Sequence, residues 1–337
     1  MTSSVLVMGG SHFLGRAVAA EALRRGWSVT VFNRGKTGRN PDGAHAIQGD
    51  RTNQDDLVRL AGIGPWDAII DTSGMSADVV DLATRTLAEA TSRYVYVSTV
   101  SVYAGWPLIP LTEDLPTLAE ADPVSGMPDD VVVSYGVDKA NAEKSARANL
   151  GRALTILRPG VILGPEEYVG RLPWWLRRIE QGGRVLAAGN PDQTIAPVDA
   201  RDVATFACDR AQVASGAEVF NLTAPKTHAT MESFLRTCIE VTGSDATLEW
   251  VDGDFLLDQG AKQWTELPLW RTYPGTWAVS GVRAKEAGLR CRPLLETIAD
   301  TWAWLSSGET AVENERAAHI GLSEEKEAAL LAAWDAR

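Results

Sequence analysis

The sequence predicts an α/β fold with a doubly wound parallel sheet and a smaller α+β lobe. In the first half of the 337 residues, short continuous apolar runs alternate with segments of helical periodicity, which is typical of parallel strands covered by helices on both faces. In the second half, prolines interrupt shorter helices and strands; they are Pro173, Pro191, Pro197, Pro225, Pro268, Pro274 and Pro293. In a doubly wound sheet, ligands bind beyond the carboxyl ends of the strands.

Each element follows from its local pattern. In the first half we expect strands at 5–8, 28–32, 66–71, 93–98 and 153–157, with a further strand before Gly49. Helices are expected between them at 17–25, 55–60, 77–90 and 134–150. The second half should add strands near 218–222 and 247–251 and an amphipathic helix that begins at Pro293. A last helix is expected at 323–334, with Ser323 as its N-cap.

Composition excludes several classes of protein. The net charge of −12, from 44 acidic and 32 basic residues, argues against nucleic acid as a partner because phosphate binding needs a basic surface. No apolar run reaches the roughly 18 residues of a membrane-spanning helix, and the N-terminus lacks the basic start of a signal peptide. The cysteines are scattered, which fits a reducing cytoplasm, and neither they nor the histidines have metal-ligand spacing. We therefore expect a cytoplasmic protein without a metal site.

A glycine-rich turn follows the first strand. Residues 9–15 read Gly-Gly-Ser-His-Phe-Leu-Gly; Gly9 permits a tight turn, and Gly15 lets the next helix pack closely on the strand. The N-terminus of that helix offers N–H groups and a positive dipole to a pyrophosphate. Because any strand-to-helix turn can use glycine, the turn alone supports a cofactor loop and a plain turn equally. The dinucleotide contacts expected here are Gly9, Ser11, His12, Phe13, Leu14 and Gly15.

The segments after the next strands supply further cofactor contacts. Where an acidic residue would bind the ribose of NAD, this sequence has Asn33 and Arg34. Arg34 can pair with a 2′-phosphate, which favours NADP(H) over NAD(H); the alternative is a solvated loop arginine. Asp50 can accept a hydrogen bond from the adenine amino group or cap the helix that follows. The set expected at this edge is Asn33, Arg34, Asp50, Arg51, Thr72, Ser73 and Gly74.

A tyrosine and a lysine lie four residues apart at the start of a predicted helix. Tyr135 and Lys139 therefore share one helix face. The unperturbed phenol pKa of about 10 is too high for acid–base catalysis near neutrality, and a nearby ammonium lowers it. Thr99 or Ser98, at the end of a strand, can hydrogen-bond a substrate oxygen as its charge changes. Any helix can carry this pair; its combination with the strand hydroxyls and the glycine turn favours a catalytic role.

Together these motifs resemble extended or atypical members of the short-chain dehydrogenase/reductase superfamily. Within it, the chain is similar to bacterial proteins labelled NAD-dependent epimerase/dehydratase or reductase and to the chloroplast stem-loop-binding relatives. The resemblance rests on residues 9–15, 31–35, 98–103, 135–139, 157–165, 198–204 and 293–304. We accordingly place a dinucleotide-binding Rossmann domain at 1–160, a substrate lobe at 161–307 with returns to the core at about 196–222, and a helical tail at 308–337.

The resemblance implies roles for particular residues. Tyr135 would be the general acid/base, and Lys139 would lower its pKa while holding the nicotinamide ribose. Thr99 falls on the catalytic hydroxyl of the family, with Ser98 just before it. Pro159, Gly160 and Val161 would close over the nicotinamide end of the cofactor.

Two departures from the family patterns bear on the reaction. Val100 and Ser101 follow Thr99 where sugar-nucleotide 4,6-dehydratases have Asp-Glu, so the groups for water elimination are missing. Gly160 stands where sugar-nucleotide epimerases commonly carry Asn, which weakens an epimerase assignment. A plain carbonyl or imine reduction, or the reverse oxidation, needs only Thr99, Tyr135 and Lys139.

Most of the 12 tryptophans lie after residue 170, in the expected substrate lobe. Large aromatic side chains often line apolar pockets, although ordinary core packing explains them equally simply. The expected substrate contacts are Val100, Trp175, Trp264 and Trp270.

These observations predict an NAD(P)-dependent oxidoreductase that uses NADP(H) in preference to NAD(H). It would reduce a carbonyl or imine of a small, partly aromatic or apolar metabolite, or run the reverse oxidation. The alternatives are an NAD(P)-dependent epimerase with transient hydride transfer and a non-catalytic dinucleotide-binding protein. The expected partner is a small-molecule substrate, and neither nucleic acid nor a membrane. A homodimer is a further hypothesis.

Overall fold

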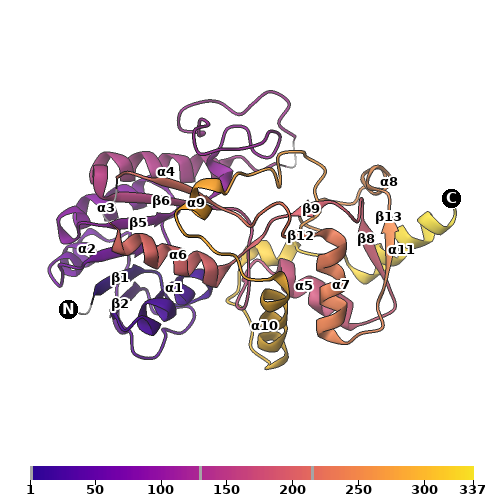
Figure 1. Cartoon of the computed structure of the whole chain (residues 1–337), viewed down its shortest axis with the longest axis horizontal. Helices are drawn as coiled ribbons and strands as arrows, with labels where there is room; N and C mark the ends of the chain where they lie inside the picture. Colours follow the sequence, from indigo (N-terminus) through magenta and orange to yellow (C-terminus); the bar gives the residue numbers. More distant parts are fainter. Residues whose placement is uncertain (1–2, 129–130, 214–215) are drawn as a thin grey trace. The chain divides into compact units, whose positions relative to one another are not determined.

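The computed structural model describes residues 3–128, 131–213 and 216–337. Contacts within the chain group it into two compact units (Figure 1). The sheet unit comprises Met1–Val161, Val198–Thr223 and Pro274–Cys291. The lobe unit comprises Ile162–Pro197, Ala224–Tyr273 and Arg292–Arg337. The segment predicted as a separate tail, 308–337, therefore shares a unit with most of the predicted lobe.

A seven-stranded sheet with the order β11-β6-β5-β4-β1-β2-β3 organises the sheet unit. Every pair of neighbouring strands in it is parallel, which confirms the doubly wound fold class. The strands are β1 (Ser4–Met8), β2 (Ser28–Asn33), β3 (His45–Gln48), β4 (Ala68–Asp71), β5 (Tyr94–Val97), β6 (Leu154–Pro159) and β11 (Val219–Leu222). The strand order reverses between β1 and β4, so the carboxyl ends of these two strands mark the switch point at which such sheets bind ligands.

Helices cover both faces of this sheet (Figure 1). One face carries α2 (Gln54–Ala61), α3 (Ala77–Leu87) and α4 (Ser134–Leu150), whose apolar residues form a common core with the strands. The other face carries α1 (Phe13–Arg24) and α6 (Ala200–Gln212), which pack against each other. All residues of β4 and β5 are buried, which is the physical reason that the strands read as continuous apolar runs.

Short elements complete the sheet unit. They are the 3-10 helices η1 (Ala88–Ala90), η2 (Val100–Val102) and η3 (Gly151–Ala153), the strand β10 (Val198–Asp199) and the helix α9 (Val282–Glu286). The helix predicted at 134–150 has these bounds in the structure. β6 continues to Pro159, two residues beyond its predicted end.

The lobe unit is built around a parallel pair of strands, β8 (Arg184–Ala188) and β13 (Thr247–Val251). Helices α5 (Arg171–Glu180), α7 (Met231–Thr242) and α10 (Leu294–Ser306) pack on one another. The remaining elements are β7 (Ile162–Leu163), β9 (Thr194–Ile195), β12 (Ala229–Thr230), α8 (Gly253–Asp258) and η4 (Glu315–His319). Within the described residues, no helix is long and apolar enough to cross a membrane.

The last helix, α11 (Glu324–Asp335), is held by its buried Glu327. The Glu327 carboxylate accepts hydrogen bonds from the Leu186 backbone N–H (2.9 Å) and from Arg178 Nε. Ser323 caps the helix by accepting from the Lys326 N–H at 3.2 Å, as its sequence predicts. Glu327 thus joins α11 to the edge of β8 and makes the C-terminal helix part of the lobe unit.

Replacement of Glu327 by leucine should lower the free energy of unfolding by about 3 kcal/mol, because the Arg178 guanidinium would stay largely buried without its counter-charge. Urea unfolding at neutral pH measures the loss. Glu325→Gln, at an exposed position of the same helix, is the matched control and should change the midpoint little. Equal effects of the two substitutions would contradict this role of Glu327.

Candidate cofactor and active site

The turn between β1 and α1 is packed so closely that only glycine fits at three of its positions. Gly9 and Gly10 have φ of +107° and +85°, in the left-handed region that favours glycine. A Cβ on Gly15 would lie 2.7 Å from the Gly10 nitrogen and 2.8 Å from Thr72 Oγ1. Phe13 opens α1 with φ of +42°, a strained value for a non-glycine residue. This turn, which we call the glycine cradle, lies at a helix N-terminus and so fits a pyrophosphate.

His12 takes the N-cap position of α1 but makes no side-chain cap hydrogen bond. Its Nδ1 lies 3.5 Å from the hydroxyl of the buried Ser11. The Leu14 side chain is buried in the core, so only the backbone of Leu14 is placed to meet a ligand. His12 therefore places an imidazole beside the first turn of α1.

Asn33, at the end of β2, braces the glycine turn. Its amide donates to the Gly9 carbonyl at 3.2 Å and to Asn40 Oδ1 at 2.8 Å. Its own oxygen accepts from the Gly35 N–H at 2.9 Å. Arg34, by contrast, is exposed.

Asp50 and Arg51, after β3, are both engaged within the protein. The Asp50 carboxylate accepts from the backbone N–H and hydroxyl of Thr52 at 2.9 and 2.8 Å. These hydrogen bonds lower the pKa of Asp50, and the charges of Arg34 and Lys36 add to the effect. The N-cap of α2 is Asn53, so Asp50 caps a turn and not the helix itself. The Arg51 guanidinium donates to the Asp71 carboxylate through Nη1 and Nη2.

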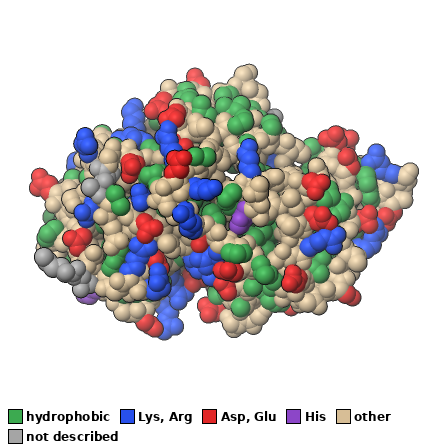
Figure 2. Space-filling view, in the orientation of Figure 1, with side chains coloured by type: hydrophobic (Ala, Val, Ile, Leu, Met, Phe, Trp, Pro, Cys, Tyr) green, Lys and Arg blue, Asp and Glu red, His purple; other side chains and the backbone are tan. Residues whose placement is uncertain are grey.

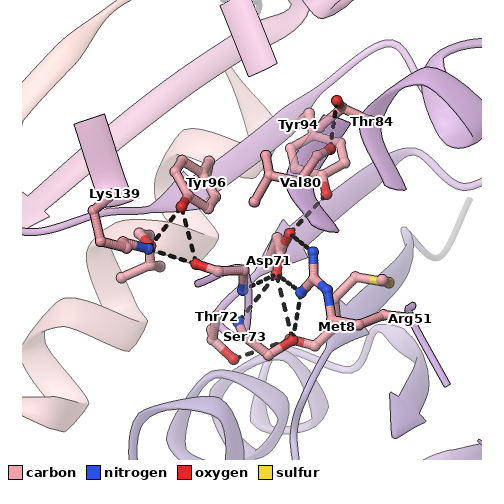
Figure 3. Close-up of polar contacts among 12 residues, drawn as sticks. Met8, Arg51, Asp71, Thr72, Ser73, Val80, Thr84, Tyr94, Tyr96 and Lys139 are labelled. Carbon is pink, nitrogen blue, oxygen red and sulfur yellow. Dashed lines mark hydrogen bonds and ion pairs between the residues drawn. The ribbon is translucent and has the colours of Figure 1, made fainter. Parts of the chain in front are cut away.

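A buried ion pair lies at the carboxyl end of β4 (Figure 3). Asp71 is 0% exposed and accepts from Arg51 Nη1 and Nη2 at 2.7 and 2.8 Å. The Tyr94 hydroxyl (2.9 Å) and the backbone N–H groups of Ser73 (3.0 Å) and Gly74 (3.1 Å) also donate to it. Burial raises the pKa of Asp71, but the Arg51 charge and the hydrogen bonds outweigh it, so the pKa is lowered overall.

The predicted cofactor residues Thr72, Ser73 and Gly74 form the loop that this ion pair orders. Thr72 Oγ1 donates to the Met8 carbonyl at the end of β1 (3.0 Å). Ser73 Oγ accepts from Arg51 Nη1 at 2.7 Å. Sequence reasoning missed the pairing of Arg51 with Asp71; its only signal was a carboxylate that ends an otherwise apolar strand.

Lys139 is buried at the base of the proposed active site, with an exposed fraction of 3%. Its Nζ donates to the carbonyls of Gly74 and Val97 at 2.7 and 2.8 Å and to the Tyr96 hydroxyl at 2.7 Å (Figure 3). Burial lowers the pKa of Lys139 to about 7. The resemblance implied that Lys139 holds the nicotinamide ribose, but here its N–H groups are all bound by protein oxygens.

Tyr135 is half-buried in the first turn of α4, one turn before Lys139. The start of this helix lies against the loop after β5, since a Cβ on Gly136 would be 2.2 Å from the Ser101 carbonyl oxygen. In that loop Thr99 caps η2, accepting from the Ser101 N–H at 3.2 Å. The helix and the strand end therefore bring the predicted Tyr135, Lys139 and Thr99 into one region of the sheet unit.

Ser98 and Val100, on either side of Thr99, differ in what they can offer a ligand. The buried Ser98 Oγ has no hydrogen-bond partner among the described residues, so this strand end offers a hydroxyl that a ligand can satisfy. The Val100 side chain is buried in a cluster with Val102, Tyr103 and Leu111. Its burial leaves almost no surface for the substrate contact expected of it.

β6 ends at Pro159, at the carboxyl end of the sheet. The Arg158 side chain pairs with Glu143 of α4 at 2.9 and 2.6 Å, and both are buried. Beyond Pro159, the Gly160 N–H donates to the Leu222 carbonyl at 3.0 Å. The Val161 carbonyl accepts from the Val198 N–H at 2.9 Å. Residues 159–161 therefore remain at the carboxyl edge of the sheet.

The tryptophans predicted to line a pocket are mostly core residues of the lobe unit. Trp175 and Trp270 are 0% and 1% exposed, and Trp175 Nε1 donates to the Pro268 carbonyl at 2.9 Å. Fully covered rings offer no face to a substrate, so these two residues are corrected to packing roles. Trp264 is half-buried, with the guanidinium of Arg271 4.8 Å from its ring centre.

The glycine turn at the switch point of the parallel sheet and the Tyr-x-x-x-Lys face of α4 are features of the short-chain dehydrogenase/reductase class of proteins. The chain belongs to the NAD dependent epimerase/dehydratase family, whose profile matches residues 5–222.

Two curated relatives match part of the chain. The chloroplast stem-loop binding protein of 41 kDa b from Arabidopsis thaliana is 24% identical over 255 residues, which are 71% of this chain and 63% of the relative. A 2′-dehydrokanamycin reductase from Streptomyces kanamyceticus is 31% identical over 148 residues, 44% of this chain and 38% of the relative. The chain thus matches less than two thirds of the length of either relative.

Solved structures share the fold over most of their length. WbmG from Bordetella bronchiseptica, determined in complex with NAD and UDP, has a TM-score of 0.68 at 16% identity, covering 92% of this chain and 97% of that one. UDP-glucose 4-epimerase from Thermotoga maritima, determined with UDP-glucose, has a TM-score of 0.66 at 18% identity, covering 90% and 99%. At these identities the likeness establishes the fold alone.

Asp71→Asn should lower the free energy of unfolding by about 3–5 kcal/mol, because it leaves the Arg51 guanidinium buried without its counter-charge. The double variant Arg51→Met/Asp71→Asn removes both charges but keeps an amide oxygen at position 71 for the Ser73 and Gly74 N–H groups, so it should recover most of the loss. Urea unfolding at pH 7 compares them. A double variant as unstable as Asp71→Asn would contradict this view of the pair.

The loss of stability in Asp71→Asn should depend on pH. The native pKa of Asp71 is lowered, so the pair contributes stability above the unfolded-state pKa of about 3.9. This contribution is lost as the pH falls through the native value. The stability gap between wild type and Asp71→Asn should therefore be constant from about pH 5 to 8 and close in acid.

Proposed function

We propose that the protein is an NADP(H)-dependent reductase of a carbonyl or imine group on a small metabolite, or catalyses the reverse oxidation. The observation that carries this proposal is the placement of Tyr135 one helical turn before Lys139 on α4, beside the loop that bears Thr99. These groups suffice for proton transfer coupled to reduction, and the acid and base needed for dehydration are missing. The name of the curated 2′-dehydrokanamycin reductase supports the reductive direction.

In the proposed reaction, different residues of the chain would bind the cofactor, orient the substrate and transfer a proton. A bound nicotinamide supplies or accepts hydride; the glycine cradle and the loop at 72–74 would hold the dinucleotide. Thr99 Oγ1 would hold the substrate oxygen by a hydrogen bond. Tyr135 would donate its proton to that oxygen as negative charge develops, and the positive charge of Lys139 would lower the pKa of Tyr135 toward the working range.

The preference for NADP(H) rests on the charges beside β2. Arg34, Lys36 and Arg39 are all exposed within six residues, and the position that binds ribose in NAD enzymes is the amide Asn33. Exposed guanidinium and ammonium groups match the charge of a 2′-phosphate.

The described residues support only a broad class of substrate. Of the three tryptophans expected to contact it, only Trp264 retains exposed surface, so the aromatic or apolar character of the substrate rests on that ring. The net charge of −12 supports a small-molecule partner and not nucleic acid. Figure 2 shows acidic and basic side chains interspersed over one face of the sheet unit. A homodimer stays a prediction.

An epimerase that reduces and reoxidises its substrate is the rival function, favoured by the likeness of the fold to UDP-glucose 4-epimerase. Net oxidation of NADPH by a panel of ketones, aldehydes, imines and keto sugars separates the two. The reductase consumes NADPH in proportion to product, whereas the epimerase interconverts sugars with no net change in cofactor.

Tyr135→Phe should reduce NADPH-dependent turnover by about 10²–10⁴-fold, the usual contribution of a positioned acid. Its affinity for NADPH, measured by fluorescence titration, should stay close to that of the wild type and serves as the control. A variant that kept full activity would instead support a non-catalytic dinucleotide-binding protein.

Arg34→Glu should weaken NADPH binding by about tenfold to a hundredfold and leave NADH binding nearly unchanged, because only NADPH carries the 2′-phosphate. Calorimetric titration with both cofactors measures the difference. Arg85→Glu, an exposed arginine on α3, is the matched control. Equal losses for NADPH and NADH, or tighter binding of NADH by the wild type, would overturn the NADP(H) assignment.

A further inference from the structure

Three oxygen atoms from two segments of the sheet unit surround the Lys139 ammonium, and we call them its seat. The Gly74 and Val97 carbonyls come from the loop after β4 and the end of β5, and the Tyr96 hydroxyl comes from the middle of β5. The Tyr96 ring also lies under the ammonium, with its centre 4.3 Å from Nζ. Tyr96 is fully buried, so its hydroxyl acts through Lys139 and does not touch a substrate.

The hydrogen-bond directions match a charged lysine. An ammonium has three N–H donors and no acceptor, and this seat offers it three oxygens. Carbonyl oxygens only accept. The Tyr96 hydroxyl donates to the Gly74 carbonyl at 2.9 Å (Figure 3) and so presents its lone pairs to Lys139.

The same seat can also accommodate the neutral amine. When Lys139 loses its proton, Nζ keeps two N–H donors and gains a lone pair. The two carbonyls can still accept, but neither can donate to that lone pair. Among the seat atoms only the Tyr96 hydroxyl can reverse, turning its proton from the Gly74 carbonyl to Nζ.

The charges around Lys139 oppose one another. Burial disfavours its positive charge most strongly, Asp71 and Glu143 favour the charge, and Arg51 disfavours it. The net result is the pKa of about 7 for Lys139. Tyr135 lies one turn away on the same helix. A small change in the seat can therefore change the protonation of Lys139 near neutral pH.

We propose that Tyr96 is a positioning residue for Lys139: its hydroxyl completes the oxygen seat of the ammonium and reverses its hydrogen bond when the lysine loses its proton. This role rests on the proposed function for its catalytic meaning, because Lys139 acts there through Tyr135. Loss of the hydroxyl removes a charge-assisted hydrogen bond and so lowers the pKa of Lys139.

The direct test is a pH titration of Lys139 by NMR in full-length protein labelled with 15N at the lysine side chains. Lys139→Arg identifies the signal. The midpoint in Tyr96→Phe should fall by about one pH unit relative to wild type, the effect of one charge-assisted hydrogen bond. Tyr94→Phe removes an equally buried hydroxyl from the same strand, but one that donates to Asp71; its midpoint should move by less than half as much.

The outcomes separate this proposal from the function on which it rests. An unchanged midpoint in Tyr96→Phe, or equal shifts in Tyr94→Phe, would overturn the role of Tyr96. If Tyr96→Phe does not fold, 3-fluorotyrosine placed at position 96 alone makes the hydroxyl a poorer acceptor, and an unshifted midpoint there would also overturn it. A shifted midpoint with no substrate turned over would refute the reductase and leave the Tyr96 seat standing.

With an active substrate, the pH profile provides the second readout. The limb of kcat that follows Lys139 should move in Tyr96→Phe in the same direction as the NMR midpoint, while KM for NADPH stays unchanged. A fall in kcat that is equal at all pH values would indicate a merely structural role and contradict the proposal.

Discussion

The buried ion pair between Arg51 and Asp71 is the constraint on which the site depends. Asp71 stands opposite Met8 in the register of β4 and β1, at the point where the strand order reverses. A carboxylate placed this deeply is costly unless it is paired and hydrogen-bonded. Arg51 satisfies that requirement through Nη1 and Nη2. The order of the loop at 72–74 follows from this pair, because Asp71 binds the N–H groups of Ser73 and Gly74.

The loop at 72–74 connects the two parts of the proposed site, the glycine cradle and the group around Lys139. On one side Thr72 bonds the end of β1 and occupies the space that a side chain at Gly9 or Gly15 would need. On the other side the Gly74 carbonyl accepts a hydrogen bond from Lys139. Gly74 itself tolerates no side chain, since a Cβ would lie 2.6 Å from Val80 and 2.9 Å from Tyr96. The proposed cofactor cradle and the proposed proton-transfer groups therefore both contact one short segment.

The sheet could be predicted from the sequence because each buried strand carries its own apolar run, and α4 because its pattern and its Tyr-x-x-x-Lys motif are local. The pairing of Arg51 with Asp71 could not, since it depends on which strands become neighbours and joins side chains 20 positions apart. The same limit explains Trp175 and Trp270. An aromatic residue in a proline-rich stretch packs inward or outward according to distant partners, and for Trp175 that partner is the Pro268 carbonyl.

Burial changes the protonation behaviour of Lys139 in the Tyr-x-x-x-Lys motif. At an exposed position a lysine keeps its charge well above neutral pH, and it then acts on a nearby tyrosine as a constant. In this seat desolvation brings the pKa of Lys139 to about 7, so the charge that acts on Tyr135 itself depends on pH. The main-chain oxygens of Gly74 and Val97 cannot adapt to that change, because a carbonyl only accepts. A hydroxyl can serve both protonation states, so in the proposed mechanism the Tyr-Lys pair depends on Tyr96 of β5.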